Sequence, residues 1–232
     1  MVHSLCIQLH KIRVTSSCSS LKRIHQQAFE SSSRTTRILW IDGLDIDINA
    51  TAPYSLLDLV NSFERLEQLR IAEMFPILQD RAFSENLTSL TRLELIITEL
   101  NGSPFYNLPN LKTLDLKYGN ISYISSNTFK FKDRKADSLF IMLSGNKLNG
   151  SSFEIGAFMN ISGSVDLDLS YNQITYLDEQ VFAPFLNAHQ DNKINLYKNP
   201  MNCSDCRSYW VFKNEKWKTN NKIYDSYCNG NN

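Results

Sequence analysis

Three aspartates, Asp115, Asp166 and Asp168, are the side chains of this sequence best placed for acid–base chemistry, because each lies within a short apolar segment. A pair of carboxylates can act as general acid and base or bind a hard cation. The sequence has four histidines, which are far apart: His3, His10, His25 and His189. No Ser-His-Asp set, glycine-rich phosphate loop or zinc motif accompanies the aspartates. We therefore expect no enzyme activity, no cofactor and no metal, and we interpret the aspartates as solvated.

Cysteines near the C-terminus offer a second kind of chemistry. Cys203 and Cys206 are close together, and Cys228 follows 22 residues after Cys206 by subtraction. Two close cysteines are half of a zinc site, but no second pair is present and His189 is the nearest histidine. Disulfides are the favoured interpretation. Because the chain has five cysteines, one must be free or bonded to another molecule.

A sequence repeat predicts the secondary-structure elements that position these residues. Apolar residues recur in the pattern L-x-x-L-x-L-x-x-N-x-L, which is typical of leucine-rich repeats, and it is clearest in residues 141–148, 167–174 and 194–201. The first leucine of each L-x-L pair gives seven markers: Leu39, Leu69, Leu93, Leu114, Ile141, Leu167 and Ile194. Their spacings, by subtraction, are 30, 24, 21, 27, 26 and 27 residues. These values lie within or near the usual range of about 20–29.

The repeat predicts an α/β solenoid, a leucine-rich repeat horseshoe with short parallel strands on its concave face. Paired leucines should point inward, and the asparagine after each strand should bond buried backbone groups of adjoining coils. Six phenylalanines should stack inside the solenoid: Phe29, Phe83, Phe105, Phe129, Phe153 and Phe182. We assign residues 36–201 to about seven repeats, 1–35 to an N-terminal cap or incomplete leader with the first half-repeat, and 202–232 to a truncated C-terminal cysteine-containing cap.

Composition and sequons bear on partner and compartment. The formal net charge is zero, which argues against general nucleic-acid binding, and no apolar run is long enough to span a membrane. Asn-x-Ser/Thr occurs seven times, more often than chance predicts, and an excess of such glycosylation sequons favours an extracellular protein. The sequons are at Asn49, Asn86, Asn101, Asn120, Asn149, Asn160 and Asn202.

Two segments carry a family resemblance. Residues 199–210, NPMNCSDCRSYW, resemble the C-terminal cysteine-rich cap of extracellular leucine-rich repeat proteins, with C-x-x-C in place of the usual C-x-C. More narrowly, residues 177–196 are similar to arthropod proteins like the non-catalytic subunit of oplophorus-luciferin 2-monooxygenase. In that cap the first cysteine pairs with the third and the second with the fourth. The resemblance therefore implies a Cys203–Cys228 disulfide, and it leaves Cys206 unpaired because the fourth cysteine is missing.

The N-terminus lacks a clean apolar stretch, so no signal peptide is visible in this chain. Cys6 and Cys18 are possible remnants of an N-terminal cap and could pair. The sequons and the resemblance favour an extracellular, secreted protein. The missing cap cysteine keeps open a fragment of a Toll-like or Slit-like receptor ectodomain, and the absent leader keeps open a cytosolic adaptor.

The outward residues of the strands are the candidate binding surface. We expect a non-catalytic protein-binding or accessory scaffold whose concave face contacts a protein ligand or partner subunit. Tyr118 and Tyr171, beside Phe140 and Met142, would form an aromatic and apolar patch. The competing interpretation is that the tyrosines only stack across neighbouring strands. The candidate contact residues are Trp40, Tyr118, Phe140, Met142, Tyr171 and Tyr197.

Overall fold

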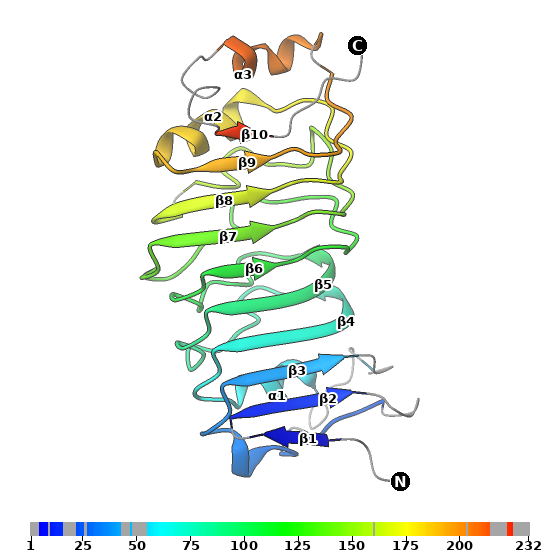
Figure 1. Ribbon diagram of the computed structural model, residues 1–232, viewed down its shortest axis with the longest axis vertical. Helices are drawn as coiled ribbons and strands as arrows, with labels where there is room; N and C mark the ends of the chain where they lie inside the picture. Colours follow the sequence, from blue (N-terminus) through cyan, green and yellow to red (C-terminus); the bar gives the residue numbers. More distant parts are fainter. Residues whose placement is uncertain are drawn as a thin grey trace.

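One sheet runs the length of the molecule, with its strands in chain order from β1 to β10 (Figure 1). In this computed structural model the described residues are 5–8, 10–15, 22–25, 27–42, 47, 55–159, 161–202, 204–213 and 222–224. Within them β1 pairs with β2 antiparallel, and each later strand pairs parallel with the one before it. The predicted solenoid is thereby confirmed.

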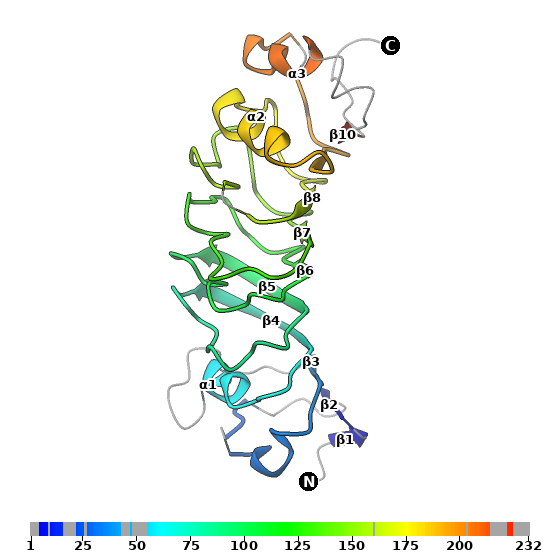
Figure 2. The same cartoon turned by 90° about the vertical axis from the view of Figure 1, so that its left-hand side faces the viewer.

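The strands are β1 (Leu5–Gln8), β2 (Lys11–Thr15), β3 (Ile38–Asp42), β4 (Gln68–Leu78), β5 (Arg92–Leu100), β6 (Thr113–Asp115), β7 (Ser138–Met142), β8 (Ser164–Asp168), β9 (Lys193–Asn195) and β10 (Ile223–Tyr224). The helices are α1 (Leu56–Asn61), α2 (Glu179–Ala188) and α3 (Tyr209–Lys213), with 3-10 turns η1 (Glu30–Ser32) and η2 (Cys206–Ser208). Figure 2 shows α1 and α2 on the side opposite the sheet.

All seven sequence markers lie in direct register, from Leu39 opposite Leu69 to Leu167 opposite Ile194. The register also extends past both ends of the predicted array. Ile12 of β2 lies opposite Leu39, and Ile223 of β10 lies opposite Ile194. The inward leucines are buried, so each coil closes its apolar face against its neighbours.

A stack of phenylalanines fills the space behind the sheet. The ring centroids of Phe83, Phe105, Phe129 and Phe158 are 6.4, 6.3 and 5.6 Å apart in turn, and the rings are nearly parallel. Phe158, not Phe153, continues this stack, so the sequence prediction was wrong at that coil. The stack ends on Phe182, 5.8 Å from Phe158. Phe153 lies edge-on to Phe182, and Phe29 pairs instead with Phe63.

Each of three buried asparagines joins its own coil to the coil before it. Asn172 Oδ1 accepts a hydrogen bond from the Leu148 amide at 3.1 Å. Its Nδ2 donates to the carbonyls of Leu143 and Leu169 at 2.9 and 3.0 Å. The same pattern recurs in the coils before and after, at Asn146 and Asn199. The side chain thus satisfies backbone groups that the turn leaves unpaired, as the sequence predicted.

Earlier coils lack this asparagine and are built differently. Five residues after the marker, the sequence has Met74, Thr98 and Gly119. In the first two of these coils, β4 and β5 run on as a long pair to Leu78 and Leu100, whereas β6 in the third has only three residues. At Gly119 a Cβ atom would collide with the Ile97 carbonyl, so glycine replaces asparagine where the coils approach most closely.

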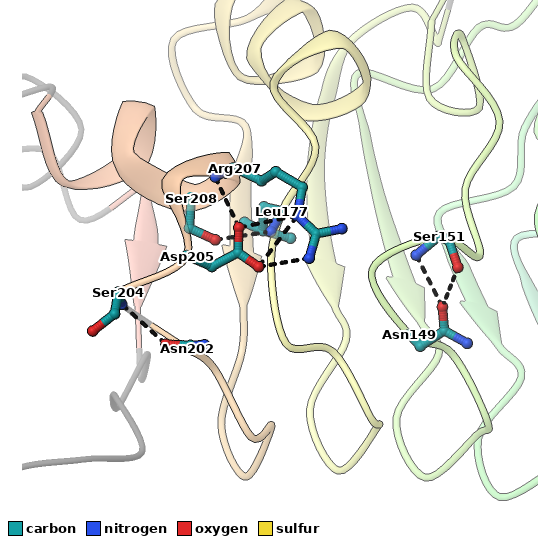
Figure 3. A network of polar contacts seen from close by, with 8 residues as sticks. All are labelled: Asn149, Ser151, Leu177, Asn202, Ser204, Asp205, Arg207 and Ser208. Carbon is teal, nitrogen blue, oxygen red and sulfur yellow. Dashed lines mark hydrogen bonds and ion pairs between the residues drawn. The ribbon is translucent and has the colours of Figure 1, made fainter.

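The C-terminal segment docks on the coil that follows β8, where side chains of the segment bond the backbone of Leu177 (Figure 3). The Leu177 amide donates to Ser208 Oγ at 3.3 Å, and Trp210 Nε1 donates to the Leu177 carbonyl at 2.9 Å. Among cysteines whose side chains are described, Cys206 is free and exposed. Cys203 and Cys228 lie outside the described residues, so their disulfide stays a prediction, as do the Cys6–Cys18 pair and the three-part division of the chain.

Candidate protein-binding surface

Two of the candidate aspartates serve the backbone. Asp115 is only 3% exposed; it accepts a hydrogen bond from the Lys117 amide at 3.3 Å and pairs with Lys117 Nζ at 3.1 Å. Asp168 accepts from the Ser170 amide at 3.0 Å in the equivalent position. Asn195 makes the same bond one coil later. The expectation of solvated carboxylates was therefore wrong for Asp115, which ends its strand by capping the following turn.

Asp166, the third aspartate, is engaged at the other end of the strands. Its carboxylate lies 3.5 Å from Lys193 Nζ, and it accepts a hydrogen bond from the Tyr224 hydroxyl at 3.2 Å. Among the described residues, no cluster of three or more histidine, cysteine, aspartate or glutamate side chains could hold a metal ion. Asp166 thus contacts β9 and β10, whereas Asp115 and Asp168 bond within their own coils.

The N-terminal half of the sheet face carries a ladder of alternating charges. Asp42 lies between Arg13 and Arg70, with nitrogen–oxygen distances of 3.6 and 2.9 Å, and Arg70 reaches Glu94 at 3.0 Å. Trp40 lies in the same region, half-buried, with Lys11 Nζ 3.7 Å from its ring centroid. These groups neutralise one another across adjacent strands, so this half of the face offers little unpaired charge to a partner.

Tyrosines mark the edge at which the later strands end. Tyr118 and Tyr171 are 70% and 53% exposed, and their φ angles are +57° and +54°. Gly145 and Lys198 occupy the same position in their own coils and also have positive φ. The coil geometry therefore requires a left-handed residue here, a conformation that suits glycine or asparagine and costs a side chain such as tyrosine roughly 1–2 kcal/mol.

These tyrosines also pack along the solenoid. The Tyr118 ring covers Gly145 so closely that a Cβ there would collide with it. Tyr171 meets Tyr197 edge-on, with ring centroids 5.5 Å apart at 77°. The same rings therefore stack on neighbouring residues and remain exposed to a partner. We call Tyr118, Tyr171, Tyr197 and Lys198 the tyrosine edge.

The predicted aromatic patch is not contiguous. Met142 is only 9% exposed, so it adds little surface for a partner. Phe140 is 36% exposed and lies beside Thr113 and Asp166, toward the opposite ends of the strands. Gly145, the residue under Tyr118, comes five positions after Phe140, in the turn beyond the end of β7. Phe140 lines a shallow, mostly polar hollow, and it does not belong to the tyrosine edge.

The sequons differ in their surroundings. Asn86, Asn101, Asn149 and Asn202 are exposed, and Asn120 is half-buried. Asn49 and Asn160 lie outside the described residues.

Two structural cations were missed by reasoning from the sequence. Arg134 donates to the carbonyls of Leu111, Ser138 and Ser162 at 2.7, 2.7 and 3.0 Å, and burial lowers its pKa to about 10. Lys222 donates to the carbonyls at the end of α2, and burial lowers its pKa as well. Neither position belongs to the repeat pattern, so the sequence offered no signal for these contacts.

The sheet, the register and the asparagine bonds define a leucine-rich repeat solenoid, a class whose typical role is to bind proteins. More particularly, the family described as "BspA type Leucine rich repeat region" matches residues 60–184 in six copies, and the chain belongs to that family. Proteins of this repeat family are usually non-catalytic.

Similarity beyond the family is distant. Among solved structures, a chain of "Octameric complex of Latrophilin 3 (Lec, Olf), Unc5D (Ig, Ig2, TSP1) and FLRT2 (LRR)" is 18% identical, with 84% of this chain and 72% of that chain covered. The TM-score is 0.35, so this likeness adds nothing to the assignment. No curated protein matches the sequence. No helix among the described residues is long and apolar enough to cross a membrane.

Proposed function

We propose that this chain is a non-catalytic, secreted scaffold that binds a partner protein through the tyrosine edge. The observation that carries the proposal is the pair of exposed tyrosines held at positive φ, Tyr118 and Tyr171. The fold alone would favour asparagine or glycine at both positions, as Gly145 illustrates between them. Strained residues that a fold does not require are concentrated at functional sites.

The chemistry of the edge suits a protein partner. Tyrosine supplies a rigid apolar ring with a polar tip, and it is enriched among residues that dominate binding energy. Lys198 lies 5.4 Å from the Tyr197 ring centroid and adds a positive charge at the same place. The tyrosine edge is therefore a mixed aromatic and basic strip beside the C-terminal half of the sheet.

Secretion and an accessory role are supported by the sequence. Seven sequons and the resemblance of residues 199–210 to an extracellular cap favour the secreted compartment. The narrower resemblance of residues 177–196 to arthropod accessory-subunit proteins favours a structural subunit of a larger complex. A full-length transcript would distinguish this scaffold from a receptor ectodomain, which would require a membrane-spanning segment.

The test replaces both tyrosines without strain. Tyr118→Asn with Tyr171→Asn keeps a residue that tolerates positive φ, so the fold should remain intact. We expect capture of partner from extracellular fluid of the source organism to fall about 30-fold or more, the loss that a 2 kcal/mol hot spot implies.

The matched control removes two other exposed tyrosines, Tyr123 and Tyr209, which are 52% and 62% exposed and lie off the edge. Tyr123→Ala with Tyr209→Ala should retain capture. Equal recovery of every partner by the edge variant and wild type, both shown to be folded by circular dichroism, would reject the tyrosine edge as the interface.

A further inference from the structure

Asn149 is an exposed sequon whose surroundings suit a covalent modification. It is exposed, and its Oδ1 accepts hydrogen bonds from both the amide and the hydroxyl of Ser151, at 2.9 and 2.8 Å (Figure 3). No described residue accepts a hydrogen bond from its Nδ2. The nitrogen that would carry a glycan is therefore available, while the amide oxygen holds the turn in place.

We propose that Asn149 carries an N-linked glycan, and that this glycan covers the flank behind the tyrosine edge. The modification rests on the secreted placement proposed above. In the reaction, Asn149 Nδ2 forms a bond to the anomeric carbon of a lipid-diphosphate-linked oligosaccharide. The bond from that carbon to the diphosphate oxygen breaks, the lipid diphosphate leaves, and a proton from the amide passes to base.

Two other sequons differ from Asn149 in ways the folded chain makes visible. Asn120 is half-buried, and its backbone amide donates to the Ile97 carbonyl at 3.0 Å. Its side-chain Nδ2 contacts Met74 Sδ at 3.8 Å. Asn101 uses its Nδ2 to donate to Gln79 Oε1 at 3.1 Å. A glycan on either nitrogen would displace a neighbouring strand side chain, whereas a glycan on Asn149 displaces nothing that the structure describes.

The position of Asn149 sets the direction of the glycan. Asn149 forms a parallel bridge with Gln173 of the next coil, on the turn that follows the buried asparagines. The neighbouring Gly150 is covered by the Tyr176 ring, whose centroid lies 3.6 Å from the Arg207 guanidinium carbon. The flank under Asn149 is thus closed by packed side chains, so an attached glycan must extend into solvent. A partner would then reach the tyrosine edge from the side of the sheet.

The experiment uses the full chain with an added secretory leader, expressed in insect cells. Purified protein is treated with peptide N-glycosidase in heavy-oxygen water, which converts each glycosylated asparagine to labelled aspartate. We expect label at Asn149 and none at Asn120. Ser151→Thr keeps the sequon and should retain the label, whereas Ser151→Ala should lose it.

Secreted, folded protein without label at Asn149, or with equal label at Asn120, would overturn the proposal. The result is independent of the tyrosine edge, because partner capture is measured with separate variants. Natural secretion is tested separately, by searching extracellular fluid and cells of the source organism for peptides of this chain by mass spectrometry. Peptides found only in cells would reject the secreted placement and the glycan together, whereas loss of partner capture alone would leave the glycan proposal unaffected.

Discussion

Replacing Asn172 with alanine removes one side chain that holds two adjacent coils together. The amide is buried and makes one accepted and two main donated hydrogen bonds to backbone groups. In the variant, the Leu148 amide loses its partner from this side chain and is left buried. The carbonyls of Leu143 and Leu169 each lose one donor but keep another, from Asn146 and Asn199 respectively.

The expected cost follows from those three groups. An orphaned buried amide costs about 1–3 kcal/mol, and each weakened carbonyl about 0.5–1 kcal/mol. Together they predict a loss of about 2–5 kcal/mol in the free energy of unfolding. Asn172→Asp should be at least as destabilising as Asn172→Ala, because its second carboxylate oxygen would face the two carbonyl oxygens in a buried site.

Urea unfolding followed by circular dichroism measures the difference. The matched control is Asn110→Ala, because Asn110 makes a single solvent-exposed bond, to the Thr88 carbonyl at 2.7 Å. We expect that control to lose less than about 1 kcal/mol. If Asn172→Ala is no more destabilising than Asn110→Ala, the buried amides do not hold the coils together and the reasoning is refuted.

Two further predictions concern the flanks and the cap. Arg134→Met should lower the free energy of unfolding by about 2–4 kcal/mol, because three carbonyls lose a charged donor. Arg134→Lys should fall between Arg134→Met and the wild type. Equal urea midpoints for the wild type and both variants would contradict this prediction. Non-reducing peptide mapping of secreted protein should recover Cys203 linked to Cys228; two free thiols would reject that disulfide, and zinc retained through purification would favour the metal interpretation.

The repeat made the fold predictable from the sequence, and the prediction was incomplete where the repeat is irregular. Seven markers were sufficient because each coil repeats one strand and one turn. The strand at Ile12 was missed because it has neither a leucine pair nor a following asparagine, although it lies 27 residues before Leu39 by subtraction. The strand at Ile223 is only two residues long. The length of β4 and β5 was not predicted: both coils lack the asparagine, but so does the coil of β6, whose strand has only three residues.

The surface was less predictable than the core. The exposure of Tyr118 and Tyr171 was anticipated, but their backbone conformation was not. Met142 was expected to be outward and accessible. It lies in register between Asp115 and Asp168, on strands about 4.8 Å apart, and only 9% of it remains exposed. The alternation of side chains along a strand predicts which face of the sheet each one points to. Its accessibility also depends on how much of it the side chains of the two neighbouring strands cover.

The uneven distribution of buried asparagines has a consequence for where the solenoid opens. A repeat protein behaves as a one-dimensional array whose stability is a sum over units and the couplings between them. The couplings around Asn146, Asn172 and Asn199 include hydrogen bonds that the coils of Met74 and Thr98 lack at this position. The solenoid therefore has two differently coupled regions, the later coils joined by buried side-chain amides and the β4–β5 pair joined by a long strand ladder, and we expect local opening to be most frequent in the coils outside both.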